Sequence, residues 1–201
     1  MRHTKAKDKL SRKYGELLSG MPMFEINKRP YPPGQHGLKR TKNSEYVSLL
    51  QEKQKLKYSY GVQENQFRRY FQKATKIKGP TGEILIQLLE TRLDNLVYRF
   101  GFAPTLAAAR QLVTHGHVLV NNKKVDIPSY QLRVKDEISL KPTKEKVKIF
   151  ADLEKRLAKY ETPAWLSFDP KTKMVKIISQ PGPEAMEQSF SPRLIVEFYS
   201  K

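Results

Sequence analysis

The chain has 201 residues, of which 38% are hydrophobic and 29% charged, so it can bury one modest core or two small ones. Its 38 Lys and Arg residues outnumber its 20 Asp and Glu residues, and the net charge of +18 favours a polyanionic partner such as nucleic acid. The lack of cysteine excludes disulfides and thiolate metal sites. No window reaches the roughly 20 apolar residues of a membrane span, and no apolar stretch follows the N-terminal charges as in a secretory signal. We therefore expect no membrane association, and a location in the cytoplasm or the interior of an organelle.

The first 43 residues are predicted to form an extended basic arm. Positive charge is densest here and falls to zero over residues 161–201, while proline and glycine interrupt any sustained helical or strand period. The run RPYPPGQHG at 29–37 predicts a stiff extended stretch that ends in a turn. A plain linker is the alternative, but the basic Lys39, Arg40 and Lys42 that follow favour a segment that orders on a partner.

Three amphipathic helices are predicted next. The first begins after Ser44, a suitable N-cap, and runs to about residue 60, the second covers about 64–78, and the third starts at Thr81. The second helix carries a basic stripe beside its apolar one, formed by Arg68, Arg69, Lys73 and Lys76. Three short helices in succession favour a small all-helical domain over residues 44–91.

From residue 92 onward the pattern is mixed. Helices are predicted over about 106–115 and, with a basic composition, over about 146–160. Short segments rich in β-branched residues predict strands at 118–120, 125–127, 138–140, 166–168 and 174–178. Residues 92–187 are therefore expected to form an α+β domain in which helices pack on an antiparallel sheet.

The helix predicted at 106–115 divides into two faces. At about 100° per residue, its apolar residues fall in one arc and its polar residues in the other. The polar arc consists of Arg110, Gln111, Thr114 and His115. All four can donate hydrogen bonds to a phosphate or a 2′-hydroxyl, so this face is a candidate RNA contact, with an ordinary solvated face as the alternative.

A predicted hairpin behind this helix adds basic residues. Its turn, Asn121-Asn122, suits a tight connection because Asn tolerates positive φ. We expect the turn to project Lys123 and Lys124 on the same side as His117. Helix face and hairpin tip together would then clamp a bent RNA backbone.

Four motifs between residues 92 and 121 resemble the S-four RNA-binding module. They are RLDNLVYR at 92–99, ARQLV at 109–113, HGHV at 115–118 and VN at 120–121. The same module occurs in pseudouridine synthases, tyrosyl-tRNA synthetases and a heat-shock ribosome-binding protein, so by itself it indicates RNA binding only.

Three further signatures narrow the resemblance. They are PGQHG at 33–37, EKQK at 52–55 with YGV at 60–62 and QFR at 66–68, and LIVEFYSK at 194–201. In this order and over nearly the whole chain, they resemble the bacterial or organellar small-subunit ribosomal proteins of the S-four family.

The resemblance implies a fold and a role. The module core would cover about 92–160, and segment 188–201 would join the helical domain. Family members are structural proteins that bind small-subunit rRNA of the 16S type directly and nucleate folding of the body. They contact the neighbouring S-five protein at a boundary that affects decoding accuracy, with S-three as a further candidate neighbour. They also place basic residues where messenger RNA enters, here Lys39, Arg40 and Lys42, and no cofactor, metal or small-molecule substrate is expected.

Residues and resemblance together define the expected rRNA-binding set. It comprises Arg92, Thr105, Arg110, Gln111, Thr114, His115, His117, Asn121, Lys123 and Lys124 in the module, Arg68, Arg69, Lys73, Lys76, Lys53 and Lys55 in the helical domain, and Gln35 and His36 in the arm.

The sequence also departs from the family pattern. Many relatives hold zinc with four cysteines in the N-terminal arm, which this cysteine-free chain cannot do. Leu106 stands where relatives usually have Arg, Asn122 where they usually have Gly, and Thr91 replaces a common Gly. One RNA contact is therefore in doubt.

Other functions remain as alternatives. An assembly factor or an RNA-modifying enzyme with the same module would need a further catalytic domain, and the residues after Tyr160 are too few for one. A DNA-binding protein is possible from charge alone. His115 and His117 lack a third metal ligand nearby in sequence, and Glu90 and Asp94 are either a carboxylate pair or the partners of neighbouring arginines.

Overall fold

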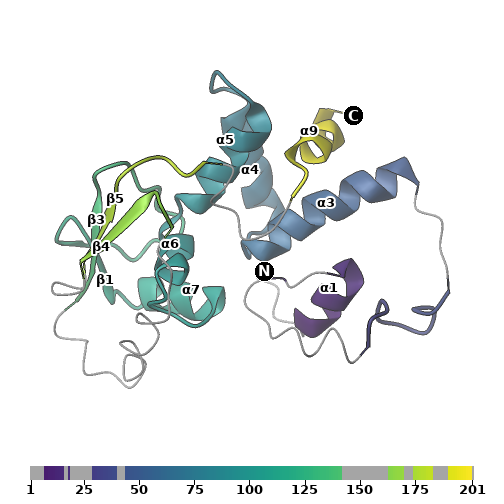
Figure 1. Cartoon of the computed structure of the whole chain (residues 1–201), viewed down its shortest axis with the longest axis horizontal. Helices are drawn as coiled ribbons and strands as arrows, with labels where there is room; N and C mark the ends of the chain where they lie inside the picture. Colours follow the sequence, from purple (N-terminus) through teal and green to yellow (C-terminus); the bar gives the residue numbers. More distant parts are fainter. Residues whose placement is uncertain are drawn as a thin grey trace. The chain divides into compact units, whose positions relative to one another are not determined.

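The computed structural model describes residues 7–15, 18, 29–39, 44–141, 163–169, 174–182 and 190–200. The chain divides into two compact units, Met1–Gly82 with Gln188–Lys201 and Glu83–Glu187 (Figure 1). The helix predicted at 146–160 lies outside the described residues. Among the residues described, no helix is long and apolar enough to cross a membrane.

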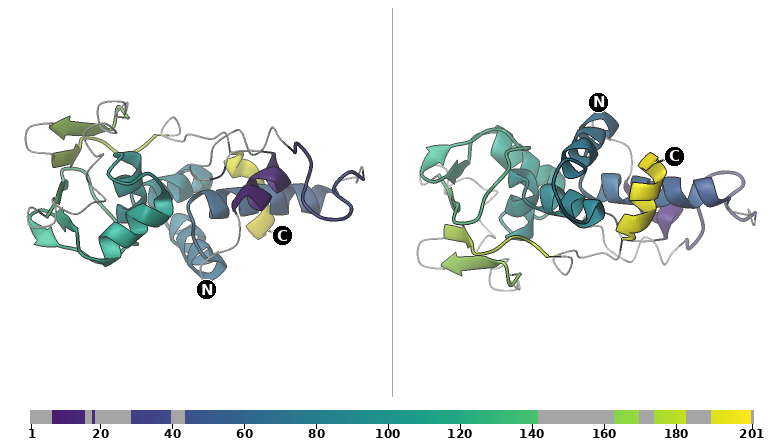
Figure 2. Two further views of the ribbon diagram at one scale, coloured as in Figure 1. Left: turned by 90° about the horizontal axis from the view of Figure 1, so that it is seen from below. Right: turned by 90° about the horizontal axis from the view of Figure 1, so that it is seen from above.

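The regular structure of the first unit, in its described residues, is helical. Its main elements are α3 (Glu45–Ser59), α4 (Glu64–Ala74) and α9 (Pro192–Ser200), and α9 packs along α3 (Figures 1 and 2). Ser44 caps α3 as predicted, because its hydroxyl accepts from the Val47 amide. The α9 ring of Tyr199 stacks on Phe71 of α4 at 4.5 Å between centroids, so the C-terminal helix belongs to this unit through an aromatic contact.

The N-terminal residues contain a helix that the sequence did not predict. Residues Lys7–Tyr14 form α1, and the buried Ser11 hydroxyl accepts from the Leu18 amide. The prediction of an arm without regular structure was wrong here, because the contacts that hold the helix come from outside it. The Tyr14 ring, for example, lies 6.3 Å from that of Tyr58 on α3.

The second predicted helix ends earlier than expected. α4 stops at Ala74, and the chain continues in a tighter turn, in which the amides of Lys76 and Ile77 donate to carbonyls three residues back. Such i→i+3 bonds commonly close an α-helix before a glycine. Gly79 then adopts a positive φ of 137°.

The second unit is mixed, which confirms the α+β prediction. It contains most of α5 (Thr81–Glu90), α6 (Leu93–Arg99) and α7 (Leu106–Thr114), followed by a five-stranded antiparallel sheet. The sheet order is β2-β1-β3-β5-β4, where the strands are β1 (Val118–Val120), β2 (Lys123–Lys124), β3 (Glu137–Leu140), β4 (Leu166–Asp169) and β5 (Met174–Ile177).

The division between the units falls inside α5, whereas the sequence placed it after residue 91. The end of α5 is bonded to later parts of the second unit, because Glu90 pairs with Arg99 of α6 and the Leu88 carbonyl accepts from Gln131. A helix whose last turn is bonded to the next helix belongs with it.

One predicted strand is replaced by a loop. Residues 125–127 form no strand: the register with β1 ends at Lys124, and one further bond follows, from the Val125 amide to the Val118 carbonyl at 3.4 Å. The chain then turns toward α6, where the carbonyls of Pro128 and Tyr130 accept from the amides of Asp94 and Leu93.

The core of this unit lies between one face of the sheet and helices α6 and α7 (Figures 1 and 2). Leu96, Phe100 and Leu112 from the helical side meet Ile138 and Val175 from the strands. Burial alternates along β3 and β5, as expected for a sheet with one covered face. The sheet therefore supports α7 through its buried face.

Candidate nucleic-acid interface

Helix α7 presents the polar face that its sequence predicts. Thr105 caps it, since its hydroxyl accepts from the Ala108 amide at 3.2 Å. The buried residues are Leu106, Ala109, Leu112 and Val113, whereas Gln111, Thr114 and His115 are exposed and Arg110 is half-buried. The division into two arcs is confirmed. Leu106 belongs to the core, and Thr105 serves the backbone of its own helix.

Within this arc the side chains differ in freedom. The Thr114 hydroxyl lies 3.1 Å from the Arg110 carbonyl and 3.0 Å from the Gln111 carbonyl, which accept its proton. Its own lone pairs remain for a donor such as a 2′-hydroxyl. Gln111, in the last turn of α7, and His115, its C-cap, are exposed, so the arc can meet a nucleic acid backbone there.

The hairpin turn forms as predicted, but its lysines point apart. Asn121 and Asn122 have φ of 50° and 62°, the geometry of a type I′ turn. Lys123 is registered opposite Val120, and Lys124 opposite Leu119. Because neighbouring strand residues face opposite sides, the expectation that both lysines lie on one side with His117 was wrong.

Asn121 has a structural task at this turn. Its amide nitrogen donates to Asp136 at 2.9 Å, and its side-chain oxygen accepts from a backbone amide of β3 at 2.9 Å. Both ends of the side chain are thus occupied by the fold. A base or phosphate would have to compete with these bonds, so the turn contributes mainly shape.

The joint between α7 and β1 brings a histidine and a lysine together. The His117 ring is largely buried, at 8% exposed, and lies 6.1 Å from the ring of His115. The Lys124 side chain crosses Gly116 so closely that a Cβ there would lie 2.2 Å from its Cε. His115 and Lys124 are therefore the accessible members of this group, and the prediction of a direct contact by His117 is corrected by its burial.

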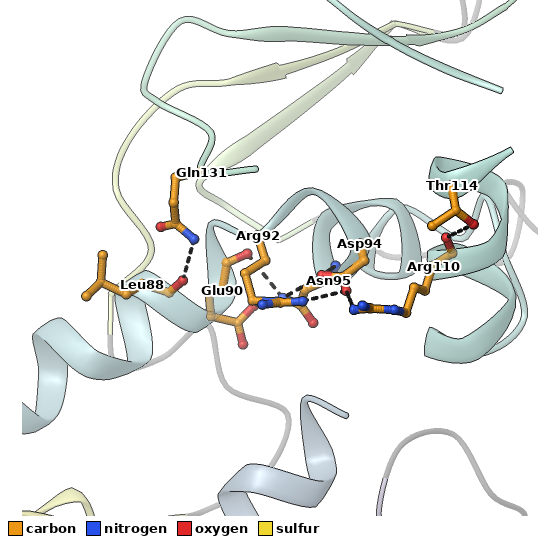
Figure 3. Close-up of polar contacts among 8 residues, drawn as sticks. All are labelled: Leu88, Glu90, Arg92, Asp94, Asn95, Arg110, Thr114 and Gln131. Atoms are coloured by element: carbon orange, nitrogen blue, oxygen red, sulfur yellow. Dashed lines mark hydrogen bonds and ion pairs between the residues drawn. The ribbon is translucent and has the colours of Figure 1, made fainter. Parts of the chain in front are cut away.

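Arg92 does not reach the surface. Its side chain is 0% exposed, and its Nε and Nη2 donate to the two carboxylate oxygens of Asp94 at 3.0 and 2.7 Å. The same carboxylate accepts from Arg110 Nη1 at 3.1 Å (Figure 3). The prediction of an RNA contact by Arg92 is therefore corrected. Sequence alone gave the charge and left a pairing with Asp94 open, but it did not show that the pair is buried.

The carboxylates of Glu90 and Asp94 each pair with an arginine and do not form a carboxylate pair with each other. Glu90, fully buried, accepts from Arg99 Nη2 at 2.7 Å and from Asn95 Nδ2 at 2.7 Å. Asp94 is engaged by Arg92 as described (Figure 3). Of the two alternatives for these residues, the arginine partners are confirmed. Among the described residues no group of three His, Cys, Asp or Glu is arranged to hold a metal ion.

The basic stripe of α4 is exposed in the first unit. Its inward residues Phe67, Phe71 and Ala74 are buried. The outward ones are Arg68, Arg69, Lys73 and, in the turn after the helix, Lys76. Four cations on one solvated surface suit a phosphate backbone.

The lysines of α3 are differently placed. Lys53 is 4% exposed, and its Nζ lies 2.8 Å from Glu64 Oε1 and 4.8 Å from the Phe198 ring centroid. Lys55 pairs with Glu52 at 3.0 Å. The prediction that Lys53 contacts RNA is corrected, because its ammonium is inside the unit. The Lys55 side chain is also largely covered. Neither lysine therefore extends freely into solvent.

Residues 29–39 form a turn that displays polar groups. The amides of Gly37 and Lys39 donate to the carbonyls of Gly34 and His36. Gly37 is required here, since a Cβ would lie 2.0 Å from the Pro32 carbonyl oxygen. The exposed members of the predicted set are Gln35, His36 and Lys39, while Arg40 and Lys42 lie outside the described residues.

Comparison with known proteins shows which family has these features. The family model described as "Ribosomal protein S4/S9 N-terminal domain" matches residues 2–90, and the model described as "S4 domain" matches residues 91–138. The chain is 45% identical over 194 residues to "Small ribosomal subunit protein uS4" of Chlorobaculum tepidum, with 96% of each chain covered. The protein of that name from Akkermansia muciniphila is 46% identical over 205 residues, with 100% and 99% covered. The chain belongs to the uS4 family.

Membership of the uS4 family confirms the resemblance inferred from the sequence motifs. The N-terminal-domain model matches the residues before the module, a region that the module alone would not explain. The match also spans almost the full length of the uS4 proteins compared. An RNA-modifying enzyme that borrows the module would not share this arrangement.

Sequence reasoning named Asp94 as a possible partner of a neighbouring arginine, but it missed that Asp94 also binds Arg110. Asp94 engages two arginines, and its side chain is almost fully buried. The pairing with a nearby arginine was one of the two alternatives that the sequence left open. That Arg110 would be the second partner depends on how α6 and α7 pack, which the spacing does not reveal.

Proposed function

We propose that this uS4-family chain is a structural, non-catalytic protein of the small ribosomal subunit that binds 16S-type rRNA directly. The observation that carries the RNA-binding role is the polar arc of α7, where Arg110, Gln111 and His115 lie on a helix fixed by a buried apolar face. The exposed α4 stripe and the net charge of +18 supply phosphate contacts.

The proposal includes the finer roles that the resemblance implies. The protein would nucleate folding of the subunit body on ribosomes of the cytoplasm or of an organelle. It would contact S-five, with S-three as a further candidate, and place Lys39, Arg40 and Lys42 where messenger RNA enters. The exposure of Lys39 supports its availability.

The deciding experiment is binding of the purified protein to the isolated 5′ domain of small-subunit rRNA, at moderate and high salt, with transfer RNA as competitor. We expect binding that survives the competitor, and a log-log salt slope of roughly 0.7 to 0.9 per phosphate contacted. If transfer RNA abolishes the binding, small-subunit rRNA is not the specific target. If duplex DNA competes equally well, the protein does not recognise folded RNA specifically.

Paired lysine variants locate the contact. Lys124→Ala removes an exposed charge at the joint between α7 and β1, whereas Lys176→Ala removes one from a lysine on β5 that pairs with Glu137. We expect the first to weaken binding and lower the salt slope by about one phosphate, and the second to change neither. Equal effects of the two variants would mean that binding depends on the total charge and not on where the charge lies.

A further inference from the structure

The carboxylate of Asp94 connects a buried arginine with one at the surface (Figure 3). From the interior, Arg92 donates to both of its oxygens at 3.0 and 2.7 Å, and the Asn95 amide donates to Oδ1 at 2.9 Å. From the surface side, Arg110 Nη1 donates to Oδ2 at 3.1 Å. The Arg110 side chain is 32% exposed, whereas that of Asp94 is 3%.

This arrangement restricts the surface arginine. An unanchored arginine loses rotamer freedom when it binds, but Arg110 is held by a carboxylate that Arg92 and a backbone amide have already fixed. A guanidinium carries five N–H donors in a rigid fork. With one directed at Asp94, others remain for a ligand on the polar arc.

We propose that Asp94 is a positioning residue for RNA binding, which holds the Arg110 guanidinium in the orientation that receives a phosphate of the backbone. This rests on the proposed function and adds a residue to it. Arg92, buried and bidentate, fixes the Asp94 carboxylate, whose Oδ2 also accepts from Arg110. The three charges sum to one positive charge, and the exposed part of that charge lies on Arg110.

Removal of the Asp94 charge should change RNA affinity in opposite directions, depending on whether charge alone or the positioning of Arg110 decides binding. Removing a negative charge beside an anion site should tighten RNA binding if charge alone matters. If Asp94 positions Arg110, the same change should weaken binding, because Arg110 must then be ordered by the RNA. Asp94→Asn keeps the shape and removes the charge, so it separates the two.

The test measures binding of the full chain to the isolated 5′ rRNA domain at one fixed salt concentration. We expect Asp94→Asn to weaken binding about tenfold, and Glu137→Gln, which removes a carboxylate charge from a surface pair with Lys176, to leave it unchanged or slightly tighter. Asp94→Asn that binds as tightly as the wild type, or more tightly, overturns the proposal. Failure of the wild type itself to bind would instead reject the proposed function.

A double variant distinguishes positioning from a general structural effect. If Asp94 acts through Arg110, then Asp94→Asn should cause no further loss in an Arg110→Ala background, since interacting residues are non-additive. The same tenfold loss in both backgrounds would overturn the proposal.

Arg110→Lys covers the case in which Asp94→Asn fails to fold, as judged by circular dichroism and thermal melting. It keeps the buried Arg92–Asp94 pair and the charge at position 110 but loses the fork. We expect it to lose most of the affinity that Arg110→Ala loses. Wild-type affinity of Arg110→Lys would show that Asp94 positions nothing that the RNA requires.

Discussion

Arg12 Nη2 donates to the Tyr31 carbonyl oxygen at 3.1 Å, and the Arg12 guanidinium carbon lies 5.1 Å from the centroid of the Tyr31 ring. Its Nε also donates to the Arg29 carbonyl at 3.1 Å. One side chain on α1 thus holds two nearby points of the segment that displays Gln35 and His36. The segment has a defined conformation because a distant arginine occupies its carbonyls.

Replacing this arginine should loosen the segment. Arg12→Ala removes two charge-assisted hydrogen bonds and a cation–π contact, and we expect it to lower the local opening free energy of residues 29–39 by about 1–3 kcal/mol. Hydrogen exchange of the Gly37 and Lys39 amides, which are bonded in the turn, measures this. Lys13→Ala, which removes a neighbouring exposed charge, is the control and should leave their exchange unchanged. Equal acceleration in both variants would show that Arg12 has no special role.

Glu64 should make stability depend on pH. It accepts from Lys53 at 2.8 Å and from Lys57 at 3.0 Å. Burial alone would raise the pKa of Glu64, but the hydrogen bonds and charges of the two lysines outweigh it and hold the pKa below its ordinary value of 4.5. A carboxyl with a lowered folded pKa stabilises the fold above the unfolded pKa, and this contribution is lost as pH falls through the folded pKa.

Glu64→Gln is therefore expected to lower the free energy of unfolding by about 1 kcal/mol at neutral pH, a modest value because the side chain is 44% exposed and solvent screens the pair. The difference from the wild type should shrink as pH falls into the range in which Glu64 protonates. Thermal melting over a pH series measures it, with Glu83→Gln at an exposed site as the matched control. A difference that stays constant into acid would contradict the ion-pair origin.

Much of the fold could be predicted because local patterns decide it. Ser44 and Thr105 cap their helices through hydroxyls that the sequence displays, and the Asn121-Asn122 pair specifies its turn. What could not be predicted depends on contacts between distant segments. α1 is too short to show a period, and its stabilising partners lie on other elements.

The candidate site divides in the same way. The exposed arc of α7 follows from helical spacing alone. Arg92 and Lys53 were both predicted to contact RNA, because the sequence does not show whether a basic side chain is buried. Glu64, 11 residues from Lys53, is recognised as its partner only in the folded chain, whereas Asp94 was already one of two alternatives near Arg92.

A close approach within the first unit can be tested with two glycines. A Cβ at Gly82 would lie 2.5 Å from Pro192 Cβ and 3.3 Å from its backbone, whereas a Cβ at Gly182 meets nothing within 4 Å. We expect Gly82→Ala to lower the free energy of unfolding by about 1–3 kcal/mol, since α9 must shift to make room. Gly182→Ala should change it by less than about 0.5 kcal/mol. Denaturant unfolding compares them, and equal stability of the two variants would mean that this contact is looser than the structure has it.

The two asparagines of the hairpin should respond to glycine with opposite signs. Both have positive φ, a conformation that glycine adopts without steric cost. Asn122→Gly should therefore raise the free energy of unfolding, by about 0.5 kcal/mol. Asn121→Gly gains the same backbone relief but loses the bonds to Asp136 and to the β3 backbone, so we expect a net loss of about 1 kcal/mol. Thermal melting of the two single variants decides the matter, because a turn governed by backbone conformation alone would make both of them more stable.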